Sequence, residues 1–196
     1  LRANEYDGIM NYSITKACLD YLVYDVFDAQ AMADRLSHIL MRNTDQANNM
    51  MLNLLDSHDT ERFLTLAKKN GKDERSLLCS LAIMFFLPGM PCIYYGTEIG
   101  MEGGYDPDCR RTFDWNRKNW NMRVYATVIN LIRLRKCIKG DVTYSAENGI
   151  LLIGRGDLIL AVNNGTEKRR TKILHKEYEI GPFEFIIINI KEGGVL

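Results

Sequence analysis

The sequence lacks the features that mark several large classes of protein. Its 25 basic and 25 acidic residues balance to a formal net charge of zero, and no long basic run provides an electrostatic footprint for nucleic acid. The longest strongly apolar stretch, Leu77 to Leu87, is too short to span a bilayer and is broken by Pro88-Gly89. No signal peptide is visible. We therefore expect a protein that binds neither nucleic acid nor membrane.

Cysteines are few and scattered. The chain has 5 of them, an odd number without a C-x-x-C pair, which argues against a disulfide framework or a zinc site. Such use of cysteine fits a reducing compartment, so we expect a cytoplasmic location. The acidic residues follow no recognised calcium-loop pattern. We expect no metal site and no cofactor.

The chain up to about Lys136 alternates short apolar runs with helical patterns. Apolar runs predict strands at residues 8–12, 50–55 and 92–95. Apolar residues at helical spacing predict helices at residues 14–22, 28–40, 76–87 and 125–136. This order implies parallel strands joined by right-handed crossovers, and hence an α/β fold.

The pattern changes from about Asp141 onwards. Short β-rich segments are separated by turn signals such as Asn148-Gly149 and Gly156-Asp157. They lie at residues 150–154, 158–163, 170–174 and 183–190. We predict a small antiparallel sheet of its own, with the boundary between about Lys136 and Val142.

Polar side chains gather directly after each of the predicted strands. They are Asn11 and Tyr12, then His58 and Asp59 with Arg62 nearby, then Tyr95, Glu98 and the loop of residues 103–111. Each cluster alone has a structural explanation: Asn11 or Asp59 could cap a helix, and Asp106 and Arg110 could form a surface ion pair worth under about 1 kcal/mol. Because functional groups collect at the carboxyl ends of parallel strands, clusters after consecutive strands favour an active-site rim.

Three stretches of the sequence resemble the α-amylase family of glycoside hydrolases, family 13. They are YDGIMNY at residues 6–12, LLDSHDTERF at residues 54–63 and LPGMPCIYYGTEIGMEGGYDPDCRRTFDW at residues 87–115. The nearest subgroup is that of neopullulanase, cyclomaltodextrinase and maltogenic amylase. The resemblance covers about Leu1 to Lys136, and the β-rich tail is similar in place and size to the small C-terminal domain of the family.

The resemblance implies a (β/α)₈ TIM barrel of which this chain holds only the last three strands. Residues 1–137 would be the C-terminal part of the barrel, and residues 138–196 a small antiparallel, β-sandwich-like domain. The first residue is Leu1, so we expect a longer parent protein with further residues upstream.

The resemblance also implies roles for four residues of this sequence. Asp59 matches the third catalytic acid, which hydrogen-bonds hydroxyls of the reacting sugar ring and stabilises the transition state, and His58 matches a histidine that binds the same ring. Asp106 and Arg110 match a pair that contacts substrate. An aspartate that binds hydroxyls is ionised, because only the carboxylate accepts at both oxygens, and a cation at Arg62 or His58 favours that state.

The parent is expected to be a retaining hydrolase of α-1,4 and also α-1,6 links in maltooligosaccharides, cyclodextrins, pullulan or starch. Its aspartate nucleophile and glutamate acid/base would lie upstream of Leu1, so we expect this chain alone to be inactive. Two alternatives are a catalytically silent amylase-like protein and a free-standing glucan-binding module. Retention of the four matched residues disfavours the first, and the incomplete barrel disfavours the second.

An α-glucan oligosaccharide is therefore the expected ligand. A protein partner is also expected, because a partial barrel leaves two open sheet edges, at residues 9–11 and 92–94. The partner would be a second copy of the chain or the missing N-terminal half.

Overall fold

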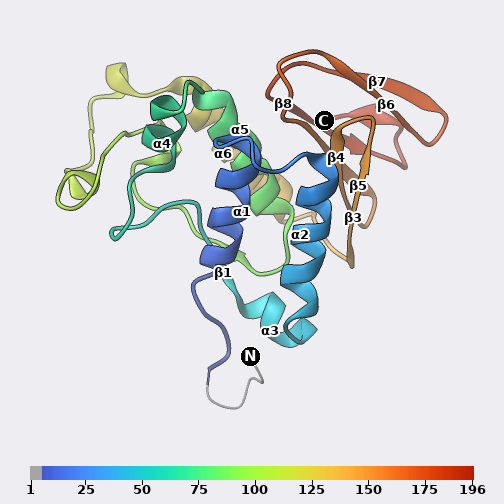
Figure 1. Cartoon of the computed structure of the whole chain (residues 1–196), viewed down its shortest axis with the longest axis horizontal. Helices are drawn as coiled ribbons and strands as arrows, with labels where there is room; N and C mark the ends of the chain where they lie inside the picture. The colour runs from blue at the N-terminus through green and yellow to red at the C-terminus, as the bar shows by residue number, and fades with distance from the viewer. Residues whose placement is uncertain (1–5) are drawn as a thin grey trace.

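Helices make up most of the first two thirds of the chain. The computed structural model describes residues 6–196 (Figure 1). Its helices are α1 (Tyr12–Leu22), α2 (Ala29–Met41), α3 (Asp45–Met50), α4 (Phe63–Lys69), α5 (Glu74–Phe86) and α6 (Met122–Arg135). Short 3₁₀ turns follow between α5 and α6: η1 (Thr97–Ile99), η2 (Asp108–Arg110) and η3 (Arg117–Asn119). All four predicted helices are confirmed; α3 and α4 were not predicted.

Local sequence explains where these helices begin and how they pack. The Asp28 side chain accepts from the backbone N–H of Ala31 at 2.8 Å and caps α2, as its position predicts. The side chain of Asn121 caps α6 in the same way. Helix α5 is buried at every residue from Ser76 to Phe86, which is why it is apolar around its whole circumference.

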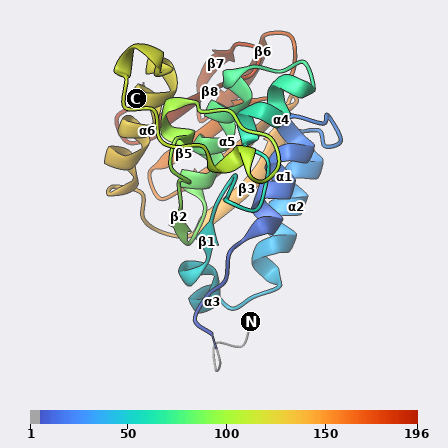
Figure 2. The ribbon, with the colours of Figure 1, turned by 90° about the vertical axis from the view of Figure 1, so that its left-hand side faces the viewer.

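A short parallel sheet lies beneath α1 and α5. Strand β1 (Leu52–Asn53) pairs in parallel with β2 (Met90–Pro91), and Met10 forms a parallel bridge to Leu52 (Figure 2). The parallel direction is as predicted, but the predicted bounds are wrong: within residues 8–12 only Met10 forms a bridge, and β2 precedes the predicted strand at residues 92–95. Residues 92–95 lie outside β2: Cys92 N still donates to Asn53 O, whereas Tyr95 O accepts from the Arg62 guanidinium. The backbone thus leaves the sheet to pair with a side chain.

The last third of the chain forms two antiparallel sheets. The larger has the order β3-β4-β5-β8-β9, and the smaller is the hairpin β6–β7. Their bounds are β3 (Val142–Glu147), β4 (Ile150–Arg155), β5 (Leu158–Asn163), β6 (Arg169–Ile173), β7 (Lys176–Ile180), β8 (Glu184–Asn189) and β9 (Gly194–Val195). The predicted antiparallel sheet is confirmed. Strands β3, β7 and β9 were not predicted. In β7, exposed Glu177 and Glu179 alternate with buried Tyr178 and Ile180, but the strand is too short and too charged for this pattern to stand out.

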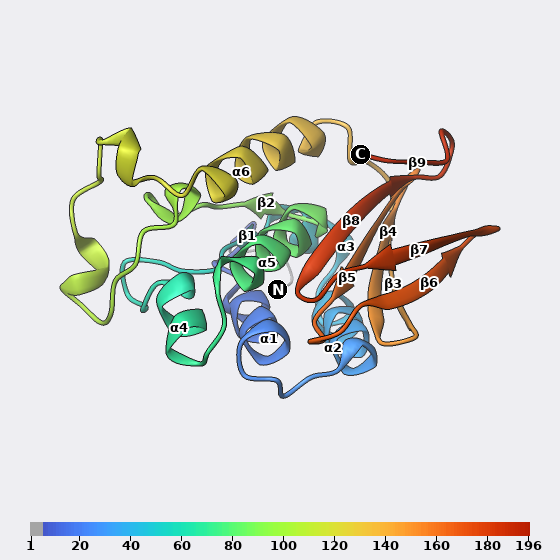
Figure 3. The ribbon, with the colours of Figure 1, turned by 90° about the horizontal axis from the view of Figure 1, so that it is seen from above.

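Both faces of the five-stranded sheet are covered. Along β5, Leu158, Leu160 and Val162 join the core formed with α1, α2 and α5. The alternate residues, Ile159 and Ala161, pack with the β6–β7 hairpin. This period of two places the sheet between the helices and the hairpin, as Figure 3 shows from above.

Polar contacts also join the helices to this sheet. Helix α6 ends at Arg135, and β3 begins at Val142. The Arg155 guanidinium of β4 donates to the carbonyls of Phe86 and Leu87, and Arg135 donates to those of Phe85 and Leu87. Both guanidinium groups therefore satisfy carbonyls at the C-terminal end of α5, which no further helical turn can reach.

Candidate functional site

The turn that follows β1 separates its polar residues into a buried and an exposed pair. Asp56 and Ser57 are each only 3% exposed, whereas the side chains of His58 and Asp59 are 56% and 60% exposed. The first pair can therefore hold the turn in place, and the second is presented to solvent.

Asp56 has a structural role. Its carboxylate accepts from the backbone N–H of Phe63 at 3.0 Å and from the Thr97 hydroxyl at 2.8 Å, which ties the start of α4 to η1. Burial raises the pKa of Asp56 above its ordinary value, and the two hydrogen bonds offset part of this effect.

The Ser57 and Thr60 hydroxyls form the turn that carries Asp59. The backbone N–H of Ser57 donates to the Thr60 hydroxyl at 2.9 Å, and the backbone N–H of Asp59 donates to the Ser57 hydroxyl at 3.1 Å. Such side-chain bonds to nearby backbone are the usual reason that Ser and Thr occur in turns. Neither of these two bonds uses the Asp59 carboxylate.

The loop of residues 103–111 is attached to the same region through α4. The backbone N–H of Arg62 donates to Gly103 O at 2.9 Å, and Gly103 N donates to the Thr65 hydroxyl at 2.8 Å. A Cβ at Gly103 would lie 2.7 Å from Asp108 O, so this close approach requires glycine. Within the loop, Arg111 and the Gly104 N–H hold the pKa of Asp108 down to about 2.

Arg110 connects the loop to the turn. Its Nε lies 2.8 Å from Asp106 Oδ1 and donates to His58 O at 3.0 Å, while its Nη2 lies 3.5 Å from Asp59 Oδ1. His58 Nε2 lies 3.2 Å from the same Asp59 oxygen. The structure thus brings the four predicted site residues, His58, Asp59, Asp106 and Arg110, into one cluster.

Arg62 does not belong to this cluster. It is fully buried beneath the aromatic residues that follow β2: its guanidinium carbon lies 4.5 Å from the centre of the Tyr94 ring and 5.1 Å from that of Tyr95. Its Nη1 donates to Tyr95 O at 2.7 Å. No hydrogen bond or ion pair joins Arg62 to Asp59 among residues 6–196. Of the two residues suggested beside Asp59, Arg62 is therefore wrong, whereas His58 does lie next to the carboxylate, together with Arg110.

Two further residues of the site received no role from the sequence. The Cys109 thiol is fully buried and donates to His58 O at 3.3 Å, next to the bond from Arg110. The only hint in the sequence was that Cys109 is an uncharged residue among the charged residues of the segment 106–111. Ser57 was read as part of a motif, but its hydroxyl bond to Asp59 could not be inferred from spacing.

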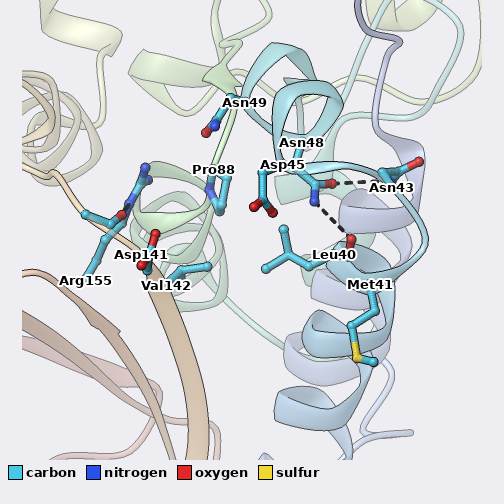
Figure 4. Close-up of a pocket in the computed structure, with 11 residues that line it drawn as sticks. Leu40, Met41, Asn43, Asp45, Asn48, Asn49, Pro88, Asp141, Val142 and Arg155 are labelled. Carbon is cyan, nitrogen blue, oxygen red and sulfur yellow. Dashed lines mark hydrogen bonds between the residues drawn. The ribbon is translucent and has the colours of Figure 1, made fainter. Parts of the chain in front are cut away.

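The site is an exposed rim rather than an enclosed cavity. A pocket of about 390 Å³ lies elsewhere, beside α3, and Figure 4 shows Leu40, Asp45, Pro88, Asp141 and Arg155 around it. None of the four clustered residues lines that pocket. In Figure 3 the loop between β2 and α6, which carries Asp106 and Arg110, lies at the end of the molecule opposite the five-stranded sheet.

Other kinds of site find no support in the described part of the chain. Residues 6–196 contain no group of three His, Cys, Asp or Glu side chains placed to hold a metal ion. None of the helices in that range has the length and hydropathy that a bilayer-spanning segment needs. The cluster of carboxylates, guanidinium and imidazole is suited to hydrogen-bonding a neutral, hydroxyl-rich molecule at an exposed rim.

The sequence is similar to those of known proteins that are named as an amylase and a cyclomaltodextrinase. The family model for the alpha amylase catalytic domain matches residues 1–140. An intracellular maltogenic amylase of Bacillus subtilis is 43% identical over 136 residues, which are 69% of this chain and 23% of that protein. A cyclomaltodextrinase of Thermoanaerobacter pseudethanolicus is 36% identical over 185 residues, covering 90% of this chain and 32% of that protein.

A solved structure is similar to this chain as well. The cyclic alpha-maltosyl-(1→6)-maltose hydrolase from Arthrobacter globiformis, in complex with maltose, superposes with a TM-score of 0.85 and 30% identity, over 93% of this chain and 45% of that chain. The present chain therefore shares the fold of the part of that chain on which it superposes. The chain spans only about a quarter to a third of the length of the two curated relatives.

Proposed function

Because the chain belongs to the alpha-amylase family, we propose that it forms part of a retaining glycoside hydrolase that cleaves α-glucans. The proposed substrates are maltooligosaccharides, cyclodextrins, pullulan or starch, with α-1,4 and also α-1,6 links. The names of the relatives support this class: a maltogenic amylase, a cyclomaltodextrinase and a hydrolase of a cyclic maltosyl-maltose. The name of the Bacillus subtilis relative also supports an intracellular, cytoplasmic location.

The observation that carries the proposal is the cluster of His58, Asp59, Asp106 and Arg110. Asp59 is proposed to stabilise the transition state by accepting hydrogen bonds from hydroxyls of the reacting ring, and His58 to bind the same ring. The contacts of Arg110 with Asp59 and Asp106 support a shared role in holding the sugar. Hydrogen bonds that strengthen as the sugar ring flattens stabilise the transition state more than the bound substrate, and they therefore lower the activation barrier.

The complete catalytic apparatus would extend beyond these residues. A retaining glycosidase needs a nucleophile and an acid/base whose carboxyl groups lie about 5–5.5 Å apart across the scissile bond. We propose that a longer protein supplies both, and that the 196-residue chain alone releases no sugar. We further propose that residues 1–137 are the last three strands and helices of the barrel, and residues 138–196 its C-terminal domain. The parallel order Met10–β1–β2 supports this arrangement.

Substitution of Asp59 tests the proposal. In the longer protein, Asp59→Asn should lower kcat by about 100- to 1,000-fold, the cost of removing one group that acts on the transition state. Arg110→Ala should act mainly on KM. Asp34→Asn, on the exposed side of α2, is the matched control and should leave both constants unchanged. A kcat within a few-fold of wild type for Asp59→Asn would contradict the assigned role.

We also propose that the edges of the short sheet bind a protein partner, either a second copy of the chain or the N-terminal part of the barrel. The apolar side chains at these edges support this, since Ile9 is 50% exposed and Met90 is 47% exposed. Light scattering with intact mass should show a dimer or a second polypeptide, and Ile9→Lys should weaken the association. A stable monomer with no second polypeptide would refute it.

A further inference from the structure

Tyr12 is an exposed residue of the site region to which no role has been given. It is the first residue of α1 and directly follows the Met10–Asn11 segment that pairs with β1. Its side chain is 38% exposed, yet its hydroxyl lies 3.2 Å from the hydroxyl of the buried Ser57. The contact joins two segments 45 residues apart in the chain.

The base of Tyr12 is held firmly by its neighbours. The backbone N–H of Asn11 donates to Leu52 O at 2.8 Å, and its side-chain amide donates to Asn53 Oδ1 at 3.0 Å. One turn further along α1, the Thr15 hydroxyl donates to Leu54 O at 2.8 Å. Residues three apart lie on the same face of a helix, so Tyr12 and Thr15 both contact the segment that follows β1. Tyr12 therefore reaches Ser57 from a backbone that is already fixed.

Ser57 connects Tyr12 to Asp59, because its hydroxyl contacts both residues. The Ser57 hydroxyl accepts from the backbone N–H of Asp59 at 3.1 Å and meets the Tyr12 hydroxyl on another side. A hydroxyl has one donor and two acceptor positions, so both contacts can be made at once. Without Tyr12 the Ser57 side chain would be free to rotate away from the Asp59 N–H.

We propose that Tyr12 is a positioning residue of this site, whose hydroxyl fixes Ser57 and thereby fixes the turn that presents Asp59. The proposal deepens the function proposed above and rests on it for its effect on catalysis. A catalytic group has to be held within about 0.5 Å of its productive position, and groups behind it provide that constraint. Tyr12 acts through Ser57, so it changes the placement of Asp59 without adding to the binding of substrate.

Amide hydrogen exchange of the chain itself gives the first test. Tyr12→Phe keeps the ring and removes only the hydroxyl, so exchange at the Asp59 N–H should be faster by about 3- to 10-fold, as expected for one lost hydrogen bond. Ser57→Ala should accelerate it at least as much. Tyr24→Phe, at another exposed tyrosine, should leave it unchanged. Unchanged exchange in Tyr12→Phe would overturn the proposal.

Kinetics of the longer protein give the second test. Tyr12→Phe should lower kcat by about 3- to 10-fold with KM within about twofold, because the effect falls on the transition state. Thr15→Val removes a hydrogen bond from the same helix face, and it should lower thermal stability while leaving kcat unchanged. This control separates positioning from general support of α1.

A double-mutant cycle tests whether Tyr12 acts through Ser57. In a Ser57→Ala background, Tyr12→Phe should cause no further loss of kcat, since the hydroxyl it would orient is gone. Full additivity of the two losses would overturn the proposed route. Asp59→Asn separates the positioning role of Tyr12 from the proposed function. A strong effect of Asp59→Asn with no effect of Tyr12→Phe contradicts only the positioning role. No effect of Asp59→Asn contradicts the proposed function.

Discussion

The two main sheets of this molecule are built in opposite ways. Strands β1 and β2 have 2 residues each, and apolar side chains of this sheet are exposed, such as Met90 of β2 at 47% and the bridging Met10 at 39%. Strands β4 and β5 have 6 residues each and are covered on both faces. The residues with proposed chemistry follow the short strands, and the long strands carry none of them.

The short sheet places the side chains of the site, whereas the five-stranded sheet stabilises the fold. The short strands contribute little burial of their own, and their role is to bring the turn at residues 56–60 and the loop at residues 103–111 to one place. The stability comes from helices that share a core with the five-stranded sheet. Helix α5 links the two, since it packs against β4, β5 and β8 of that sheet and leads directly into β2.

The largest expected effect is on the shared core. Leu160 in β5 is fully buried among the helices, so Leu160→Ala should lower the free energy of unfolding by about 3 kcal/mol, within the usual range of about 2–5 kcal/mol for such a cavity. Ile9→Ala at the half-exposed edge of the short sheet should cost less than about 1 kcal/mol. Urea unfolding followed by circular dichroism measures both. Equal losses would mean that the short sheet stabilises the fold as much as the long one does.

The same comparison explains how much of the fold could be predicted. Short β-rich segments separated by turn signals predicted the antiparallel sheet, and the apolar residues of α5 predicted a buried helix, because burial and tight turns leave local patterns in the sequence. The extent of β2 could not be predicted, because Tyr95 O pairs with the Arg62 side chain and not with a strand. Helix α4 was missed because it has only 7 residues and begins among charged side chains.

For the site, the sequence predicted which residues gather but not how they are held. His58, Asp59, Asp106 and Arg110 could be matched by motif and by their place after parallel strands. Arg62 was misjudged because sequence distance from Asp59 says nothing about direction, and its guanidinium points beneath the Tyr94 and Tyr95 rings. Contacts between distant hydroxyls, such as Tyr12 with Ser57, leave no periodic signal at all.

The second effect concerns the junction between the two regions. Arg155→Met keeps much of the side-chain volume but leaves the Phe86, Leu87 and Gly140 carbonyls without its guanidinium, so we expect a loss of about 2 kcal/mol in the free energy of unfolding. Arg170→Met is the matched control, because Arg170 pairs with Glu179 on the exposed surface of the hairpin, and it should cost less than about 0.5 kcal/mol. A cost for Arg155→Met as small as that of the control would show that the junction does not depend on these bonds.

The smallest effect lies at Asp56, beneath the candidate site, and is visible as a dependence on pH. Burial raises the pKa of this carboxyl above its ordinary value of 3.8, so just above pH 3.8 the folded chain keeps a proton that the unfolded chain releases. Through that window the contribution of Asp56 to stability falls as pH rises, and above the raised pKa it stays at its lower level.

Asp56→Asn removes this titration while keeping the shape of the side chain. The amide oxygen can accept from the Phe63 N–H and the amide nitrogen can donate to the Thr97 hydroxyl, the two groups that the carboxylate now contacts. Near pH 4 the variant should therefore match wild type within about 1 kcal/mol, and its relative stability should increase as the pH is raised to 7. Urea unfolding of both proteins at a series of pH values gives this difference directly. A difference that falls with rising pH would mean that the hydrogen bonds outweigh burial and that the charge at Asp56 stabilises the turn. A constant difference would mean that the two effects cancel, and it would also contradict the raised pKa.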